Sequence, residues 1–115
     1  MASAIKQLRD GGSVLHTWNL TTADTTGDAI QWPGAADRTV QFISASFGAA
    51  TVVFEWSLDG TNFVTATDGQ GNVISFTAEG GEMVAENALF FRPRLSVAGS
   101  GAIIQARLHS RSTMR

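Results

Sequence analysis

The stretch "TVVFEWSL", residues 51–58, decides the fold, because its side chains alternate with a period of two. Val52, Phe54, Trp56 and Leu58 share one face, whereas the opposite face is mostly polar. This period is typical of a strand that buries one face against a core. We therefore predict a strand here, with these four large apolar side chains pointing inward.

The same kind of pattern continues on both sides of this stretch. Residues 39–47 form a nearly continuous apolar segment, which favours a strand buried on both faces. Residues 91–97 and 102–109 alternate again, and residues 98–101 are expected to join them as a hairpin. Turn residues recur about every 8–12 positions along the chain. The sequence predicts an all-β fold, a single-domain antiparallel β-sandwich or jelly-roll-like barrel of eight or nine short strands.

The N-terminal region departs from this pattern. Residues 3–10 fit a short helix with Ser3 as its N-cap and with Ile5 and Leu8 on one face. A helix this short is not stable alone, so we expect an arm that docks on a neighbouring subunit rather than joining the core. The predicted organisation is an arm over residues 1–12, a β-sandwich over 13–110 and a basic tail over 111–115.

The composition of the 115 residues excludes several kinds of chemistry. The absence of cysteine rules out disulfides, thiolate metal sites and cysteine nucleophiles. There is no apolar run long enough for a membrane span or a signal peptide, so we expect synthesis in a cytoplasm and no membrane partner. The net charge of −2 gives no reason to expect nucleic acid as a partner.

Two loops have the composition of a calcium or sugar site: "DGTN" at 59–62 and "DGQGN" at 68–72. A calcium loop that began at Asp68 would need a glycine at its sixth position, where Val73 stands, and would need more carboxylates. Asp-Gly and Asn also supply the backbone conformations of tight turns. We therefore predict that both loops turn the chain and that the protein holds no metal or cofactor.

No catalytic constellation stands out. His16 and His109 are the only histidines, they are far apart in the chain, and no nucleophile motif surrounds any serine. We expect no catalytic residue and a protein that is not an enzyme.

Charge is distributed unevenly along the chain. Residues 24–86 contain nine acidic residues and one arginine, whereas residues 92–115 contain five arginines and no acidic residue. Glu55, Glu82 or Glu86 would neutralise the arginines within the fold; otherwise the carboxylates of a partner would do so. We expect a docking face for a particle or for sister subunits that includes these arginines: Arg92, Arg94, Arg107, Arg111 and Arg115.

Three apolar residues complete the candidate interface. Trp32 stands at a strand end between Gln31 and Pro33, where an exposed indole would stack on a sugar ring or anchor a subunit contact. Plain burial of Trp32 is the third possibility. Ile5 and Leu8 are included as the apolar face of the arm.

The runs "FGAATVVFEWSLDGTNF", "DGQGNVISFTAEGG" and "FRPRLSVAGSGA" resemble small structural proteins of the virions of tailed bacteriophages. The likeness covers roughly residues 40–108 and leaves out the N-terminal 38 residues and the basic tail. It implies a non-enzymatic β-sandwich that decorates a capsid shell or belongs to a tail.

Three hypotheses follow from the resemblance and the composition together. The first is a capsid decoration protein bound to the outside of the shell, with the major capsid protein or another virion protein as its partner. The second is a tail or neck component, and the third is a carbohydrate-binding module that uses Trp32 and the two loops. In the first two, the protein is located in the virion and forms a homo-oligomer, a dimer or a trimer.

Overall fold

The structure is a computed structural model that describes residues 1–9, 12–32 and 35–112. Strands account for the regular structure of this part of the chain, and no helix is found in it. The elements are β1 Ile5–Leu8, β2 Val14–Thr21, β3 Ile30–Gln31, β4 Asp37–Ser46, β5 Thr51–Ser57, β6 Val64–Thr65, β7 Ser75–Phe76, β8 Gly80–Met83, β9 Phe90–Val97 and β10 Ile103–Arg111.

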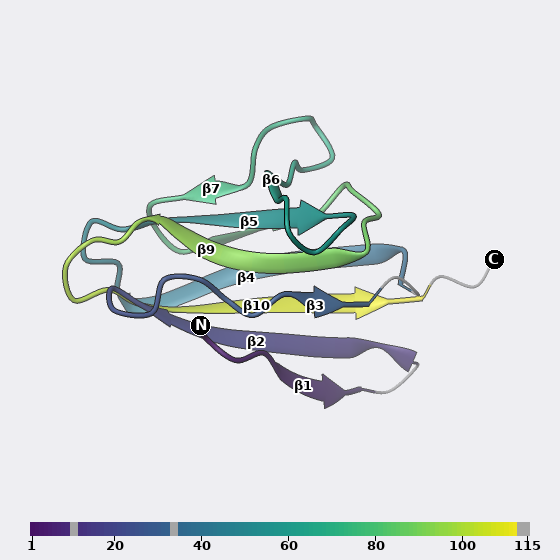
Figure 1. Ribbon diagram of the computed structural model, residues 1–115, viewed down its shortest axis with the longest axis horizontal. Helices are drawn as coiled ribbons and strands as arrows, with labels where there is room; N and C mark the ends of the chain where they lie inside the picture. Colours follow the sequence, from purple (N-terminus) through teal and green to yellow (C-terminus); the bar gives the residue numbers. More distant parts are fainter. Residues whose placement is uncertain (10–11, 33–34, 113–115) are drawn as a thin grey trace.

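The strands form two antiparallel sheets that pack face to face, as the two layers in Figure 1 show. The first sheet has the order β1-β2-β10-β4-β8, and we call it the docking sheet because β10 carries Arg107 and Arg111 of the docking face that was expected from the sequence. The second has the order β3-β9-β5-β6, with β7 also paired to β5, and we call it the paired sheet. The predicted β-sandwich is confirmed, with ten strands in the described part of the chain where eight or nine were expected.

Aromatic residues fill the space between the sheets. Trp18 on β2 packs edge to face against Phe54 on β5, and Phe54 stacks on Phe91 of β9 with ring centroids 5.9 Å apart. The Trp18 indole N–H donates a hydrogen bond to the carbonyl oxygen of Asp28 at 2.8 Å, so this buried donor is satisfied. The alternation that placed Val52 and Phe54 inward is confirmed.

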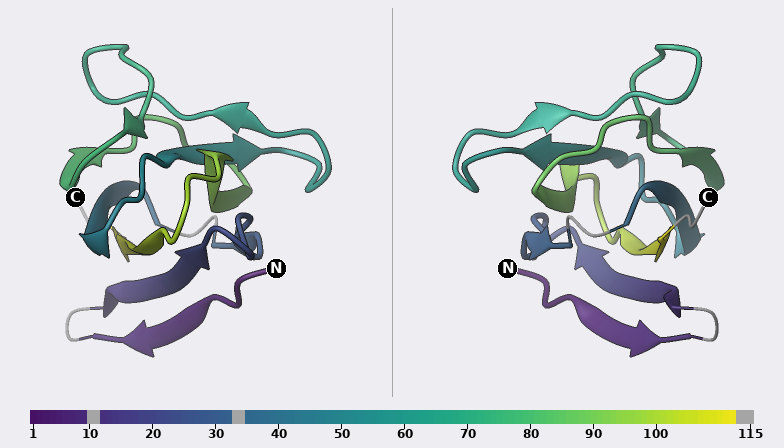
Figure 2. Two further views of the ribbon diagram at one scale, coloured as in Figure 1. Left: turned by 90° about the vertical axis from the view of Figure 1, so that its left-hand side faces the viewer. Right: turned by 90° about the vertical axis from the view of Figure 1, so that its right-hand side faces the viewer.

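The predicted helix over residues 3–10 is wrong, because β1 is a strand paired antiparallel to β2 (Figure 2). Ala2 is buried in the core of its own chain, and its N–H donates to the carbonyl oxygen of Thr26. A short helix has to be stabilised by packing alone, whereas the edge of β2 offers backbone partners directly. The N-terminal segment therefore pairs with its own chain, while Asp10, the end of the expected helix, is outside the described residues.

Two predictions about individual strands are also wrong. β4 alternates between buried and exposed residues, so it is buried on one face only. On β5, Glu55 and Ser57 are buried although they were expected outside, Trp56 is only partly buried, and Leu58, just after the strand, is 61% exposed. The reason is local: Arg92 and Arg94 of β9 bond the Glu55 carboxylate, and Ser57 Oγ bonds the loop that follows β5.

The expected hairpin through residues 98–101 is wrong as well, because β9 lies in the paired sheet and β10 in the docking sheet. The connection crosses between the sheets and packs against the β4–β5 turn, where the Ser100 N–H donates to the Gly48 carbonyl oxygen at 2.8 Å. A Cβ on Gly99, whose φ is +68°, would lie 2.5 Å from that same oxygen. Glycine therefore allows this crossover to fit so closely.

Candidate functional site

The five arginines that were predicted as one docking surface lie in separate places. Arg92 and Arg94 are on β9 in the paired sheet, whereas Arg107 and Arg111 are on β10 in the docking sheet. Arg115 is outside the described residues. The two groups are therefore carried by different layers of the sandwich and differ in their surroundings.

On the paired sheet, the arginines are neutralised within the chain. Arg92 Nε lies 3.0 Å from Glu55 Oε1, and Arg94 donates to Glu55 Oε2 through Nε and Nη2 at 3.1 and 3.0 Å. Glu55 is directly opposite Arg92 in the register of β5 and β9, and its carboxylate is buried. The Arg92 guanidinium also stacks over the ring of Phe63, 3.8 Å from the centroid. These two cations are thus engaged by the fold itself.

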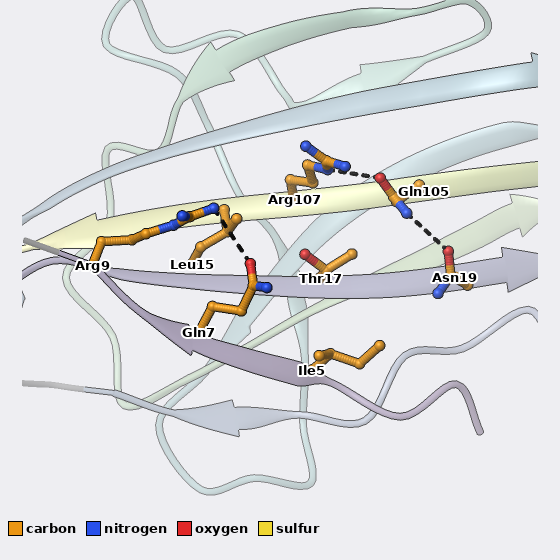
Figure 3. Close-up of a pocket in the computed structure, with 8 residues that line it drawn as sticks. All are labelled: Ile5, Gln7, Arg9, Leu15, Thr17, Asn19, Gln105 and Arg107. Atoms are coloured by element: carbon orange, nitrogen blue, oxygen red, sulfur yellow. Dashed lines mark hydrogen bonds between the residues drawn. The ribbon is translucent and has the colours of Figure 1, made fainter.

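The outer face of the docking sheet has a different character. It carries a hollow of about 380 Å³, shown in Figure 3. From β1 and the residue after it come Ile5, Gln7 and Arg9. From β2 and β10 come Leu15, Thr17, Asn19, Gln105 and Arg107.

The register of the three strands explains how the hollow forms. Thr17 is paired with Ile5 on one side and with Arg107 on the other, and it is buried at the floor. Its short side chain leaves space between the longer side chains on β1 and β10. Neighbouring side chains in such a cross-strand row are about 5 Å apart, so groups on all three strands can contact one ligand.

Amide groups hold the guanidinium of Arg107. Its Nε donates to Gln105 Oε1 at 2.6 Å, and Gln105 Nε2 donates in turn to Asn19 Oδ1 at 3.2 Å (Figure 3). Arg9 makes a longer contact from Nη2 to Gln7 Oε1 at 3.4 Å. Among the described residues, no carboxylate forms an ion pair with either of these arginines.

The rest of this face is exposed and has few acidic residues. Arg111 and His109 are exposed on β10, and Ile103 at its beginning is 61% exposed. Of the described strand residues whose side chains lie on this outer face, Asp37 is the one carboxylate, opposite Arg111 at the end of the strand pair. The hollow itself has no acidic residue among the side chains that line it.

The apolar candidates occupy the β1 side of the molecule. Ile5 is 51% exposed at the hollow, and Leu8 is 74% exposed beside it on the edge strand. Trp32 was considered the most exposed of the tryptophans, but it is partly buried against the core and contacts His16 edge to face. Lys6 Nζ lies 4.4 Å from the centroid of the Trp32 ring, so this face of the indole is covered.

A buried cluster of polar residues beneath β2 was not predicted. Arg38 on β4 is 2% exposed, donates to the carbonyl oxygen of Trp32 at 2.9 Å and stacks over Phe91. His16, also buried, stacks on Trp18, and burial followed by the charge of Lys6 lowers its pKa. The signal in the sequence was the period of two, which places Arg38 on the same face of the strand as Val40 and Phe42, where a cation needs internal partners.

The two aspartate loops direct their carboxylates to their own backbone. Asp59 Oδ1 accepts from the N–H groups of Thr61 and Asn62 at 2.8 Å, and Asp68 Oδ1 accepts from Gln70 and Asn72 at 2.9 and 3.0 Å. Hydrogen bonds from backbone N–H groups, that of Asn62 first, lower the pKa of Asp59. This is turn chemistry, with carboxylates already occupied by donors.

Comparison with known protein families, with curated proteins and with solved structures found no match. The described part of the chain contains no group of three or more histidine, cysteine or acidic side chains placed to hold a metal ion. Nor does any helix within residues 1–9, 12–32 and 35–112 have the length and apolarity needed to cross a bilayer.

Proposed function

We propose that the protein is a non-enzymatic structural protein that docks on another protein through the outer face of the docking sheet. The observation that carries this proposal is the contrast in charge pairing between the two sheets. Arg92 and Arg94 have Glu55, whereas Arg9 and Arg107 have no carboxylate among the described residues. Unpaired cations beside exposed apolar side chains are typical of a surface completed by a partner.

The shape of the face supports this role. Five adjacent strands present a continuous surface, and Ile5 and Ile103 are both more than half exposed on it. Arginine is enriched in protein interfaces, and the fully buried centre of an interface is more apolar than the rest of the surface. A fold with small loops and a wide sheet face suits docking on a large particle.

We further propose that this partner is a virion protein of a tailed bacteriophage, and that the chain decorates the outside of the capsid. The support is the resemblance over residues 40–108, together with a small cysteine-free domain that gains stability from neighbours. Assembly as a dimer or trimer on the shell belongs to the same proposal. A tail or neck position is the alternative within this class.

The carbohydrate-binding alternative has less support. Trp32 is partly buried, and Lys6 occupies one side of its ring. The carboxylates of Asp59 and Asp68 accept hydrogen bonds from their own loops, which leaves fewer groups to bind sugar hydroxyls.

The proposal is tested by co-sedimentation of the purified chain with emptied capsids that lack it and, separately, with isolated tails. We expect saturable binding to capsids at a fixed number of copies. Binding to tails alone would move the protein to the tail or neck. Binding to neither, with specific binding on a glycan array, would overturn the proposal in favour of a carbohydrate-binding module.

A further inference from the structure

We propose that the hollow between β1, β2 and β10 binds carboxylate side chains from an extended acidic segment of the partner protein. This inference rests on the proposed docking function and specifies the chemistry of the contact. It assigns to Arg9 and Arg107 the role of bonding the carboxylates.

The guanidinium of Arg107 is held in place and still has donors to offer. Within the chain it uses Nε only, on the Oε1 atom of Gln105, which Asn19 positions in turn. The two terminal nitrogens therefore remain available for an acceptor outside the chain. Two parallel N–H···O bonds to one carboxylate are the strongest geometry that a guanidinium offers.

The walls of the hollow favour a polypeptide ligand. Ile5 and Leu15 offer apolar contact, while Gln7 and Asn19 offer amide groups that can bond a peptide backbone. No aromatic residue lines the hollow, so a base would have nothing to stack on. A nucleic acid also requires a longer track of cations, and the chain as a whole has a net charge of −2.

The approach to the hollow is open on one side. β1 is the edge strand of the docking sheet, and all four of its residues are exposed. An extended segment can cross β1 and place alternate side chains into the hollow. The volume of about 380 Å³ is sufficient for a few side chains and is too small for a folded domain.

A second copy of the same chain is a poorer source of the carboxylates. Many of its acidic side chains already accept hydrogen bonds within their own chain: Glu55, Asp59, Asp68, Glu79 and Glu86. Releasing one of them would cost the bonds that it makes now. The carboxylates are therefore expected to come from a different protein.

The test uses hexa-L-glutamate as the probe and follows backbone amide shifts of the ¹⁵N-labelled chain at low salt. We expect shifts confined to β1, β2 and β10 that weaken as salt is raised. The double variant Arg9→Gln with Arg107→Gln should bind at least about tenfold more weakly, because charge-assisted bonds are lost. Arg111→Gln is the matched control: it removes one charge from the same face outside the hollow and should change affinity less than about twofold.

Three results would overturn the inference. One is the absence of shifts in the three strands. The second is equal binding of hexa-L-glutamine, which would mean that charge is irrelevant. The third is equal or tighter binding of a twelve-residue oligothymidylate, which would identify a nucleic-acid surface instead.

Capsid binding by the same variants separates this inference from the proposed function. Loss of both hexaglutamate and capsid binding in the double variant supports the inference. If the wild-type chain binds hexaglutamate in the hollow but binds no capsid, the carboxylate site stands and the virion assignment fails. If the double variant binds capsids as well as the wild type does, docking stands and the hollow is not the contact.

Discussion

The two outer faces of the sandwich use arginine in opposite ways. On the paired sheet, Arg92 and Arg94 share the two oxygens of the buried Glu55 carboxylate. On the docking sheet, Arg9 and Arg107 contact only neutral amides within the described chain. Similar residues thus have a carboxylate partner in one layer and have none among the described residues in the other.

The position of the nearest acidic residue therefore decides the role of each arginine. The arginines of β9 and β10 are close together in the sequence, but the crossover between these two strands places them in different sheets. Glu55 is placed opposite Arg92 by the register of β5 and β9, and the register of the docking sheet provides no such residue opposite Arg107.

The largest effect is expected from removing the shared carboxylate. Glu55→Gln leaves two cations side by side on the paired sheet, without their partner. Breaking a buried ion pair typically costs about 3–5 kcal/mol, but the arginine side chains are 23% and 36% exposed, so we expect roughly 2 kcal/mol. The free energy of unfolding from a urea titration measures this loss.

Removal of a carboxylate at an exposed site provides the control for that experiment. Glu82→Gln removes a carboxylate from an exposed position on the edge strand β8 and should change stability by less than about 0.5 kcal/mol. If Glu55→Gln were as mild as Glu82→Gln, the arginines of the paired sheet would not depend on Glu55. The contrast between the two sheets would then disappear.

The two histidines lie on opposite sides of the docking sheet: His16 is buried on the inner side, and His109 is exposed on the outer side. Burial first, and then the charge of Lys6, lower the pKa of His16, so the native state binds its proton less readily than the unfolded chain. The stability from neutral His16 is fully present above about pH 6.5 and is lost as the pH falls through the lowered native pKa. The unfolding midpoint should therefore decrease as the pH is lowered from 7.5 to 5.5.

Two variants assign that pH dependence to one residue. His16→Gln should flatten the decrease, whatever its effect on stability at neutral pH. His109→Gln changes the exposed histidine on the outer face and should leave the slope as it is. A slope that follows His109 would place the sensitive group on the docking face and not beneath it.

A smaller effect is expected at the loop that follows β5. Asp59→Ala removes the acceptor for the Thr61 and Asn62 N–H groups and should lower the unfolding midpoint, because the two backbone donors lose the partner that fixes the turn. Thermal melts with calcium and with a chelator should have the same midpoint. A calcium-dependent rise of several degrees would show that the loop binds metal, because ligands stabilise the state that they bind.

Much of the fold could be predicted from the sequence because alternation reports directly which face of a strand is buried. Val52 and Phe54 were placed correctly in this way. Alternation does not identify the sheet to which a strand belongs, so the crossover at residues 98–101 was taken for a hairpin. The glycines in this stretch are compatible with a hairpin turn and with a crossover, so the local sequence does not distinguish the two.

The N-terminal strand and the hollow could not be predicted for a related reason. Four residues are too few to distinguish a strand from one helical turn, and β1 becomes a strand only because β2 is beside it. Arg9 therefore was not considered as a site residue, and Gln105 and Asn19 had no visible reason to meet. Their juxtaposition is a property of register across β1, β2 and β10.

The most direct test of the division between the sheets compares two double variants in one experiment, measuring capsid binding and the unfolding midpoint of each. For Arg9→Gln with Arg107→Gln, we predict that binding is lost and that stability changes by less than about 0.5 kcal/mol. For Arg92→Gln with Arg94→Gln, we predict the reverse: a loss of roughly 2 kcal/mol, with binding retained below the melting range. Retained binding in the first variant, together with lost binding and an unchanged midpoint in the second, would contradict the account.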